Sequence, residues 1–154
     1  MTINISSDKN VSKVSDLNNS INKIVVSRGN PFAKLMIIGE APGAKEEEIG
    51  EPFVGRSGKL LDKLLQNAGI DINQDVYFCN VVKCRPPKNR RPTKIEIQEN
   101  LPWLYQQIKL VNPSVIVLVG ATALEAILKI KSPISILRGL SLIHISEPTR
   151  RYFI

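Results

Sequence analysis

Short, continuous apolar runs alternate with stretches of helical periodicity through the middle of the chain. The runs predict buried strands, and they cover residues 34–39, 75–82 and 113–120. Apolar residues spaced three and four apart predict helices over residues 57–69, from residue 93 onward and over residues 121–130. Strands that alternate with helices in this way predict an α/β protein with a parallel sheet.

Local signals mark the ends of two of these helices. Gly69 follows the first helical pattern and is a natural stop. Thr93 and Glu96 match the S/T-x-x-E capping box and predict the start of the second helix. Pro102 falls inside that helix, so we expect a kink or a break near Leu101. The apolar face of the second helix is predicted to consist of Ile97, Leu101, Leu104 and Ile108.

The segment between the first strand and the first helix reads "GEAPGAKEEEIGEPFVGRSGKLL" and predicts a long loop. Ligands of open parallel sheets bind beyond the carboxyl ends of the strands. We therefore expect this loop to converge with Asn80, at the end of the second strand, and with the loop after Val119. The loop has no G-x-G-x-x-G, and Gly58-Lys59 is followed by Leu60 rather than by Ser or Thr. These absences weaken the alternative of a small nucleotide-binding protein.

Charge points to a polyanionic partner. The formal net charge is +7, from 21 basic and 14 acidic residues. Residues 83–94, "KCRPPKNRRPTK", contain no acid, and their prolines exclude a helix and stiffen the backbone. A stiff loop loses less entropy on docking than a flexible one. Nucleic-acid contact is predicted here, with a solvated loop as the alternative, and the predicted contacts are Lys83, Arg85, Lys88, Arg90 and Arg91.

Composition narrows the class of protein. Hydrophobic residues make up 43% of the chain, enough for one core. No segment approaches the roughly 20 apolar residues of a membrane span, and the polar start, residues 1–24, is predicted to be an arm rather than a secretory signal. Cys79 and Cys84 are too few for a disulfide framework. We expect a reduced, cytoplasmic protein.

Several linked segments resemble the family 4 uracil-DNA glycosylases. "GNPFAKLMIIG", "GEAPGAKEEEIGEPFVGRSGKLL" and "NVVKCRPPKNRRP" follow the order and spacing of that family. The resemblance covers about residues 25–140 and marks them as a glycosylase-like domain. It implies an αβα sandwich around a four-stranded parallel sheet. It also implies base excision repair, in which uracil is flipped out of DNA and its N-glycosidic bond is hydrolysed.

Phe53 and Asn80 have roles in reading the base under this resemblance. Phe53 stands alone in the Gly/Pro loop, and the resemblance implies that it stacks on the flipped base, which is worth roughly 1–3 kcal/mol. The alternative is a plug over the core. The Asn80 amide offers a donor beside an acceptor. That pair fits O4 and N3–H of uracil and mismatches cytosine. The alternative is an asparagine that caps a turn.

Glu40 is the acid nearest the first strand and the candidate catalytic residue. A carboxylate there could stabilise positive charge on the sugar and polarise a water. In the related classical uracil glycosylases an aspartate lies one residue later, where this chain has Ala41. The backbone N–H groups from Ala41 to Gly43 could hold uracil O2 as charge develops there. Glu46 and Glu47 align with an acidic pair of the family, and a solvated acidic turn explains them equally well.

Two features depart from the family. It holds a 4Fe–4S cluster through four cysteines, whereas only Cys84 matches a ligand position here and the last position is Asn100. A cluster of this kind needs about four thiolates, so we expect no cofactor in this chain. The family's fourth strand and "HPS" motif do not follow "ILRG", and His144 is not given a catalytic role. We expect residues 141–154 to be a tail outside the family fold.

These departures shape the functional prediction. The sheet should have three strands plus a missing or makeshift fourth, which "SLIHIS" could supply beside the third strand. We expect a carboxy-terminally truncated uracil-DNA glycosylase with weak activity, because the "HPS" motif is missing. The alternative is a catalytically inactive DNA-binding module of the same fold. Uracil-containing DNA is the predicted partner of a monomer with no membrane association and no evident protein partner.

Overall fold

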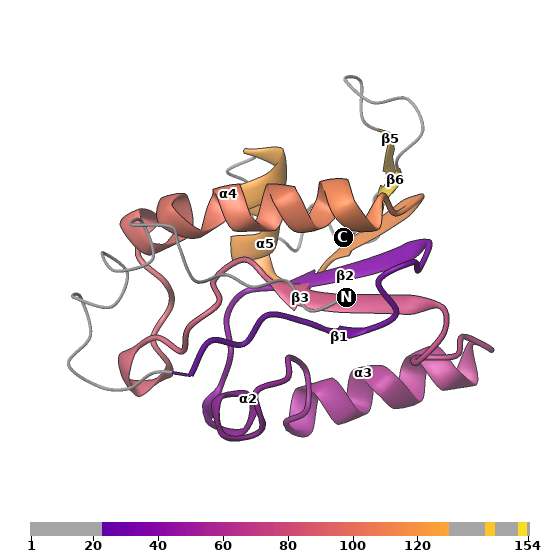
Figure 1. Cartoon of the computed structure of the whole chain (residues 1–154), viewed down its shortest axis with the longest axis horizontal. Helices are drawn as coiled ribbons and strands as arrows, with labels where there is room; N and C mark the ends of the chain where they lie inside the picture. Colours follow the sequence, from indigo (N-terminus) through magenta and orange to yellow (C-terminus); the bar gives the residue numbers. More distant parts are fainter. Residues whose placement is uncertain (1–22, 130–140, 144–150, 154) are drawn as a thin grey trace.

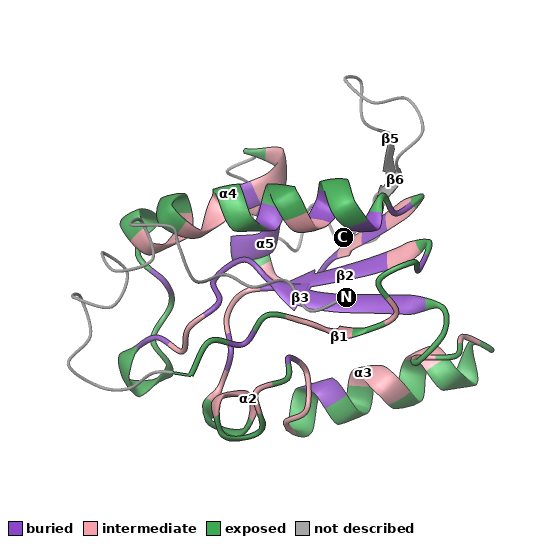
Figure 2. Ribbon diagram, in the orientation of Figure 1, coloured by how far each residue is buried: buried purple, intermediate pink, exposed green. Residues whose placement is uncertain are grey.

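The apolar run that ends at Gly39 forms the central strand of the sheet. The computed structural model describes residues 23–129, 141–143 and 151–153. β2 (Leu35–Gly39) lies between β3 (Val76–Asn80) and β4 (Val115–Leu118), and both neighbours run parallel to it (Figure 1). The three predicted strands are confirmed, and each is shorter than its apolar run. Buried residues dominate β2 and β3, as expected for strands covered on both faces (Figure 2).

Short strands extend the sheet at both edges. β1 (Arg28–Gly29) pairs antiparallel with β3. β6 (Arg151–Phe153) pairs parallel with β4, and β5 (Ser141–Ile143) pairs antiparallel with β6. Among the described residues the order is therefore β1-β3-β2-β4-β6-β5.

The tail does add a strand beside β4, but the predicted segment was wrong. Residues 151–153 take that place, and residues 141–143, the start of "SLIHIS", lie one position further out. The register of such short segments is only weakly specified by their pattern. His144 and residues 1–22 of the predicted arm lie outside the described residues.

Helices cover both faces of the sheet and complete the predicted αβα sandwich. α2 (Ala44–Ile49) and α3 (Arg56–Asn67) lie on one side, below the sheet in Figure 1. α4 (Lys94–Val111) and α5 (Ala121–Leu128) lie on the other. No helix in the described parts of the chain is long and apolar enough to cross a bilayer.

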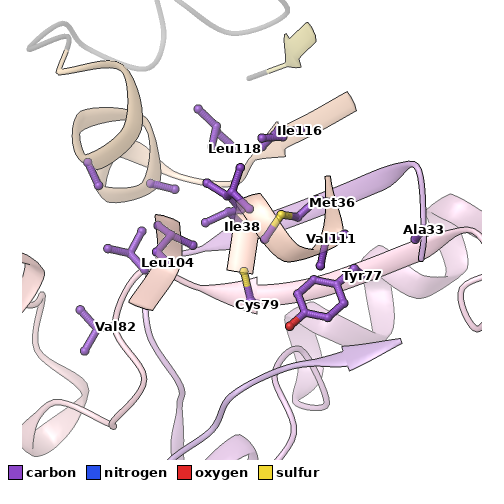
Figure 3. Close-up of a cluster of buried hydrophobic side chains, with 14 residues drawn as sticks. Ala33, Met36, Ile38, Tyr77, Cys79, Val82, Leu104, Val111, Ile116 and Leu118 are labelled. Atoms are coloured by element: carbon purple, nitrogen blue, oxygen red, sulfur yellow. The ribbon is translucent and has the colours of Figure 1, made fainter. Parts of the chain in front are cut away.

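Alternation along the strands divides the core into two clusters. On the α4 and α5 side, Met36 and Ile38 pack with Leu104 and Ile116 (Figure 3). On the α3 side, Ile37 packs with Phe78 and Val76. Successive side chains of a strand point to opposite faces, so one apolar run supplies both clusters.

α4 confirms the predicted cap and corrects the predicted break. The Thr93 hydroxyl accepts from the backbone N–H of Glu96, and the Glu96 carboxylate accepts from the N–H of Thr93 at 2.7 Å. The helix then continues through Pro102 to Val111. Pro102 is exposed, and so is Gln98, whose carbonyl loses its intrahelical partner to the proline. Water can satisfy that carbonyl, so the helix does not need to end.

The long first loop is more ordered than its composition indicated. Its "AKEEEI" stretch forms α2, and Gly50 ends it in the left-handed conformation with φ of 89°. A second short element, the 3-10 turn η1 (Pro87–Asn89), lies in the basic proline segment. Both elements stiffen loops that follow the carboxyl ends of strands.

Candidate active site

The candidate site lies at the carboxyl ends of β2 and β3. Gly39 and Asn80 are paired in register at the last position of these two strands. Glu40 follows β2 directly, and the backbone carbonyls of Gly39 and Glu40 accept from the N–H groups of Val81 and Val82. The two strand ends are therefore held together beyond the last sheet pairing. This places the loop after β2 beside the end of β3, as the parallel topology required.

Asn80 and Phe53 converge over Gly39. A Cβ on residue 39 would lie 2.5 Å from Oδ1 of Asn80 and 2.6 Å from Cζ of Phe53. Asn80 is only 4% exposed. Among the described residues no hydrogen bond reaches its side-chain amide, so the turn-capping alternative finds no support there. Buried polar groups are normally paired, and a buried amide without a protein partner is typical of a ligand-reading group.

Phe53 is held by its surroundings in an unusual backbone conformation. Its φ is 59°, which is uncommon for a residue other than glycine. The ring packs on Phe78 with a centroid distance of 5.7 Å. Arg28 donates to the carbonyls of Pro52 at 2.7 Å and Phe53 at 3.2 Å, and it pairs with Asp62 at 2.6 Å. Phe53 thus packs on the core through one part and faces Asn80 with another.

Glu46 ties the two ends of the first loop together. Its carboxylate accepts from the N–H of Gly43 at 3.2 Å and from the N–H of Gly55 at 2.7 Å. Glu47 instead pairs with Arg85 at 3.0 Å, and both side chains are partly buried. Neither acid lies in a freely solvated turn. The Gly43 N–H, expected to be available for uracil, is already used inside the loop.

Glu40 is half-buried and contacts the opposite side of the site. Oγ1 of Thr122, in the first turn of α5, donates to Oε2 of Glu40. Thr122 is fully buried, and its Oγ1 accepts from Nε of Arg91 at 3.0 Å. Sequence reasoning placed the loop after Val119 at this edge but did not single out Thr122. Its position two residues after Gly120, which precedes α5, was the available signal.

Lys83 does not belong to the exposed basic segment. It is 7% exposed, and its Nζ donates to the carbonyl of Asn80 at 2.5 Å and to Oε1 of Gln107. Burial lowers the pKa of its ammonium, and the nearby Cys79 opposes that shift. The prediction that Lys83 contacts DNA does not fit this position. Its ammonium instead supports the end of β3 from which the Asn80 side chain projects.

The remaining basic residues are close to the surface, and their arginines are paired with acids. Arg90 forms two hydrogen bonds of 2.8 Å to Glu96, which lower the pKa of that carboxyl to about 2. Arg91 pairs with Glu125 at 3.0 Å. Lys88 is exposed in η1 with φ of 55°. Salt bridges at such exposure are weak, so a phosphate could compete for these arginines.

A cavity of about 340 Å³ lies beside this basic segment rather than over Phe53 and Asn80. Its walls are Arg91, Pro92, Thr93, Lys94, Ile97 and Glu125. Arg91 therefore borders the cavity and also contacts Thr122.

The residues present do not fit an iron–sulfur cluster. Cys84 is half-buried, and burial together with Glu47 raises the pKa of its thiol. At the family's last ligand position, the side-chain oxygen of Asn100 accepts from the backbone N–H of Lys83 at 3.0 Å. Cys79 is fully buried in the core, which raises its pKa to about 11. The whole sequence has two cysteines, and the described residues contain no group of three or more possible metal ligands. A cluster needs about four thiolates.

The sequence is similar to those of known proteins. The family model of the Uracil DNA glycosylase superfamily matches residues 26–152. The type-4 uracil-DNA glycosylase of Thermotoga maritima is 51% identical over 102 residues, 66% of this chain and 53% of that protein. The type-4 enzyme of Archaeoglobus fulgidus is 43% identical over 112 residues, 73% of this chain and 56% of that protein.

A third relative is named as a DNA polymerase rather than as a glycosylase. The DNA polymerase of Bacillus phage SP01 is 33% identical over 107 residues, 70% of this chain and 12% of that protein. The chain spans about half the length of the type-4 glycosylases of Thermotoga maritima and Archaeoglobus fulgidus.

Proposed function

This chain belongs to the uracil DNA glycosylase superfamily, and from that premise we propose that it removes uracil from DNA by hydrolysing the N-glycosidic bond. The contacts of the site support this chemistry. An enzyme that acts on an extruded base reads its edge by hydrogen bonds and stacks it on aromatic or apolar side chains. Asn80 is the proposed reader, Phe53 the proposed stacking partner and Glu40 the proposed catalytic carboxylate.

The observation that carries the proposal is the buried, unpartnered amide of Asn80 beside Phe53. The amide would donate to O4 of uracil and accept from N3–H, while Phe53 stacks on the ring. Cytosine presents the opposite pair and would leave buried groups unsatisfied, at a cost of about 1–3 kcal/mol each. Lys83 and Gln107 support the strand end that carries the reader.

Glu40 would act on the sugar side of the bond. As the C1′–N1 bond breaks, its electron pair moves into uracil and positive charge develops on the sugar. The Glu40 carboxylate stabilises that charge and orients a water, whose oxygen bonds to C1′ and whose proton passes to Glu40. Uracil leaves as an anion, and the backbone N–H of Ala41 would hold its O2. We omit Gly43 from this role, because its N–H is bonded to Glu46.

DNA would bind along the proline-stiffened segment through Arg85, Lys88, Arg90 and Arg91. Guanidinium groups suit phosphate recognition because their fork of donors matches its oxygens. Each phosphate contact adds to the salt dependence of binding. We also propose residues 25–140 as the functional domain of a cytoplasmic monomer.

The test is release of uracil from an oligonucleotide with one uracil, with protein in excess so that a single turnover is seen. Asn80→Ala should slow release about 100-fold or more, and Glu40→Gln about 100- to 10,000-fold. Gln106→Ala, an exposed change on α4, is the matched control and should leave the rate unchanged. Equal rates for Asn80→Ala and the unmodified chain would contradict the proposed reader.

A second candidate is a DNA-binding module of the same fold without catalysis. The exposed arginine-rich segment favours it, because that segment does not depend on the pocket. Salt-dependent binding to duplex DNA with no release of uracil would establish this candidate and reject the first.

A further inference from the structure

Thr122 lies between two charged groups, and the chemistry of each assigns the direction of its hydrogen bonds. The Arg91 guanidinium has donors only, so Oγ1 of Thr122 must accept from its Nε. The single hydroxyl proton is then left for the other neighbour, Oε2 of Glu40. An ionised carboxylate only accepts, so both bonds are consistent. Glu125 pairs with the far side of Arg91 at 3.0 Å and completes a chain of four side chains.

We propose that Thr122 is a positioning residue that aims the carboxylate of Glu40 at the glycosidic bond. The proposal rests on the catalytic role given to Glu40 above. Glu40 stands in an irregular segment between β2 and α2, where no regular backbone ladder fixes its side chain. Thr122 holds one of its two oxygens, Oε2. In the described part of the chain no hydrogen bond reaches Oε1, and that oxygen is the one free to meet a water or the sugar.

The bond is more specific than burial of a threonine requires. A threonine in a first helical turn commonly bonds to backbone within its own turn. Here its hydroxyl instead bridges Glu40, 82 residues away, and Arg91, 31 residues away. A donor at Oγ1 also strengthens the bond that the same hydroxyl donates, because hydrogen bonds in a chain polarise one another. Misplacing a reacting group by 1 Å can cost about 100-fold in rate.

Arg91 connects the hydrogen-bonded pair of Thr122 and Glu40 to the proposed DNA-binding segment. It lines the cavity beside the basic segment, and its side chain is more exposed than that of Glu125, with which it pairs. Its Nη2 pairs with Glu125, while its Nε bonds to Thr122. The arginine can therefore anchor Thr122 through one nitrogen while another faces the surface.

The experiment compares Thr122→Val, which keeps the shape but loses the hydroxyl, with Thr122→Ser, which keeps the hydroxyl. Each is made in the unmodified chain and in Glu40→Gln. Single-turnover release of uracil should fall about 10- to 100-fold in Thr122→Val and recover most of that loss in Thr122→Ser. Affinity for uracil-containing DNA should not change. In the Glu40→Gln background, Thr122→Val should cost almost nothing more, because both changes remove one interaction.

A second readout is independent of catalysis. The ¹³C carboxyl resonance of Glu40, assigned by its loss in Glu40→Gln, should shift in Thr122→Val and return in Thr122→Ser. Thermal unfolding of each variant confirms that it is folded. If the unmodified chain releases no uracil, the proposed function fails, and this resonance alone decides whether Thr122 positions Glu40.

Four results would overturn the proposal. The first is a Thr122→Val rate equal to that of the unmodified chain. The second is a loss of the same size with and without Glu40→Gln, since it would show that Thr122 does not act through Glu40. The third is an unchanged Glu40 resonance in Thr122→Val. A Thr122→Ser variant as slow as Thr122→Val would assign the effect to packing and would also reject the positioning role.

Discussion

A single methyl group added at Gly39 should change the activity of the candidate site much more than the stability of the fold. Its backbone is not in the left-handed region, so alanine is acceptable in conformation. The new Cβ, however, would lie 2.5 Å from Oδ1 of Asn80 and 2.6 Å from Cζ of Phe53. Ordinary contacts are about 3.5–4.0 Å, so both groups must retreat by roughly 1 Å. Phe53 is pressed on Phe78 and held by Arg28, which leaves it little room to do so.

The magnitude follows from two opposing terms. Overpacking of this kind costs about 1–3 kcal/mol, while replacing a glycine inside a strand by alanine gains about 0.5–1 kcal/mol. The expected net loss in the free energy of unfolding is about 0–2.5 kcal/mol, and it lowers the melting temperature by at most roughly 10 °C. A displacement near 1 Å in the pocket should slow uracil release about 100-fold. The rate of uracil release should therefore change more than the free energy of unfolding.

The assay is single-turnover uracil release, measured at a temperature where every variant is folded, together with thermal unfolding. Gly69→Ala is the matched control. Gly69 has φ of 77°, so alanine is strained there by about 1–2 kcal/mol, but nothing lies within 4 Å of its Cβ. It should lose similar stability and keep its rate. Gly39→Ala with unchanged stability and unchanged release would refute the convergence of Asn80 and Phe53 over residue 39.

Three further outcomes follow from the contacts. Gly58→Ala should destabilise the protein by about 1–3 kcal/mol in chemical denaturation, because its Cβ would lie 1.9 Å from a backbone oxygen of the preceding loop; any gain in stability would contradict that packing. Arg90 depresses the pKa of Glu96 from 4.5 to about 2, so the stability from this contact is present above pH 4.5 and is lost as the pH falls toward 2. The melting temperatures of the unmodified chain and Glu96→Gln should converge over that range, and a constant difference would reject the assignment. In thiol labelling at pH 8 the native protein should react at Cys84 and not at the buried Cys79. Both cysteines should react in denaturant. Early labelling of Cys79 would show that the core is open.

Local signals in the sequence were sufficient for much of the fold. Three apolar runs became β2, β3 and β4, because a strand buried on both faces needs an uninterrupted apolar run. Thr93 and Glu96 formed the predicted cap, since both partners lie within one turn. The convergence of Glu40 with Asn80 was also predictable, because parallel strands bring their carboxyl ends to one edge. The site roles of these residues remain proposals.

Other features were decided only by tertiary structure. Lys83 reads as part of a basic loop, yet its ammonium is buried because Gln107, on α4, and the carbonyl of Asn80 accept from it. Pro102 is tolerated because the helix face around it is exposed. Thr122 forms a hydrogen bond with Glu40, which lies 82 residues earlier in the sequence. Periodicity and spacing report on neighbours within a turn or a strand, whereas hydrogen-bond partners and burial depend on which distant segments pack together.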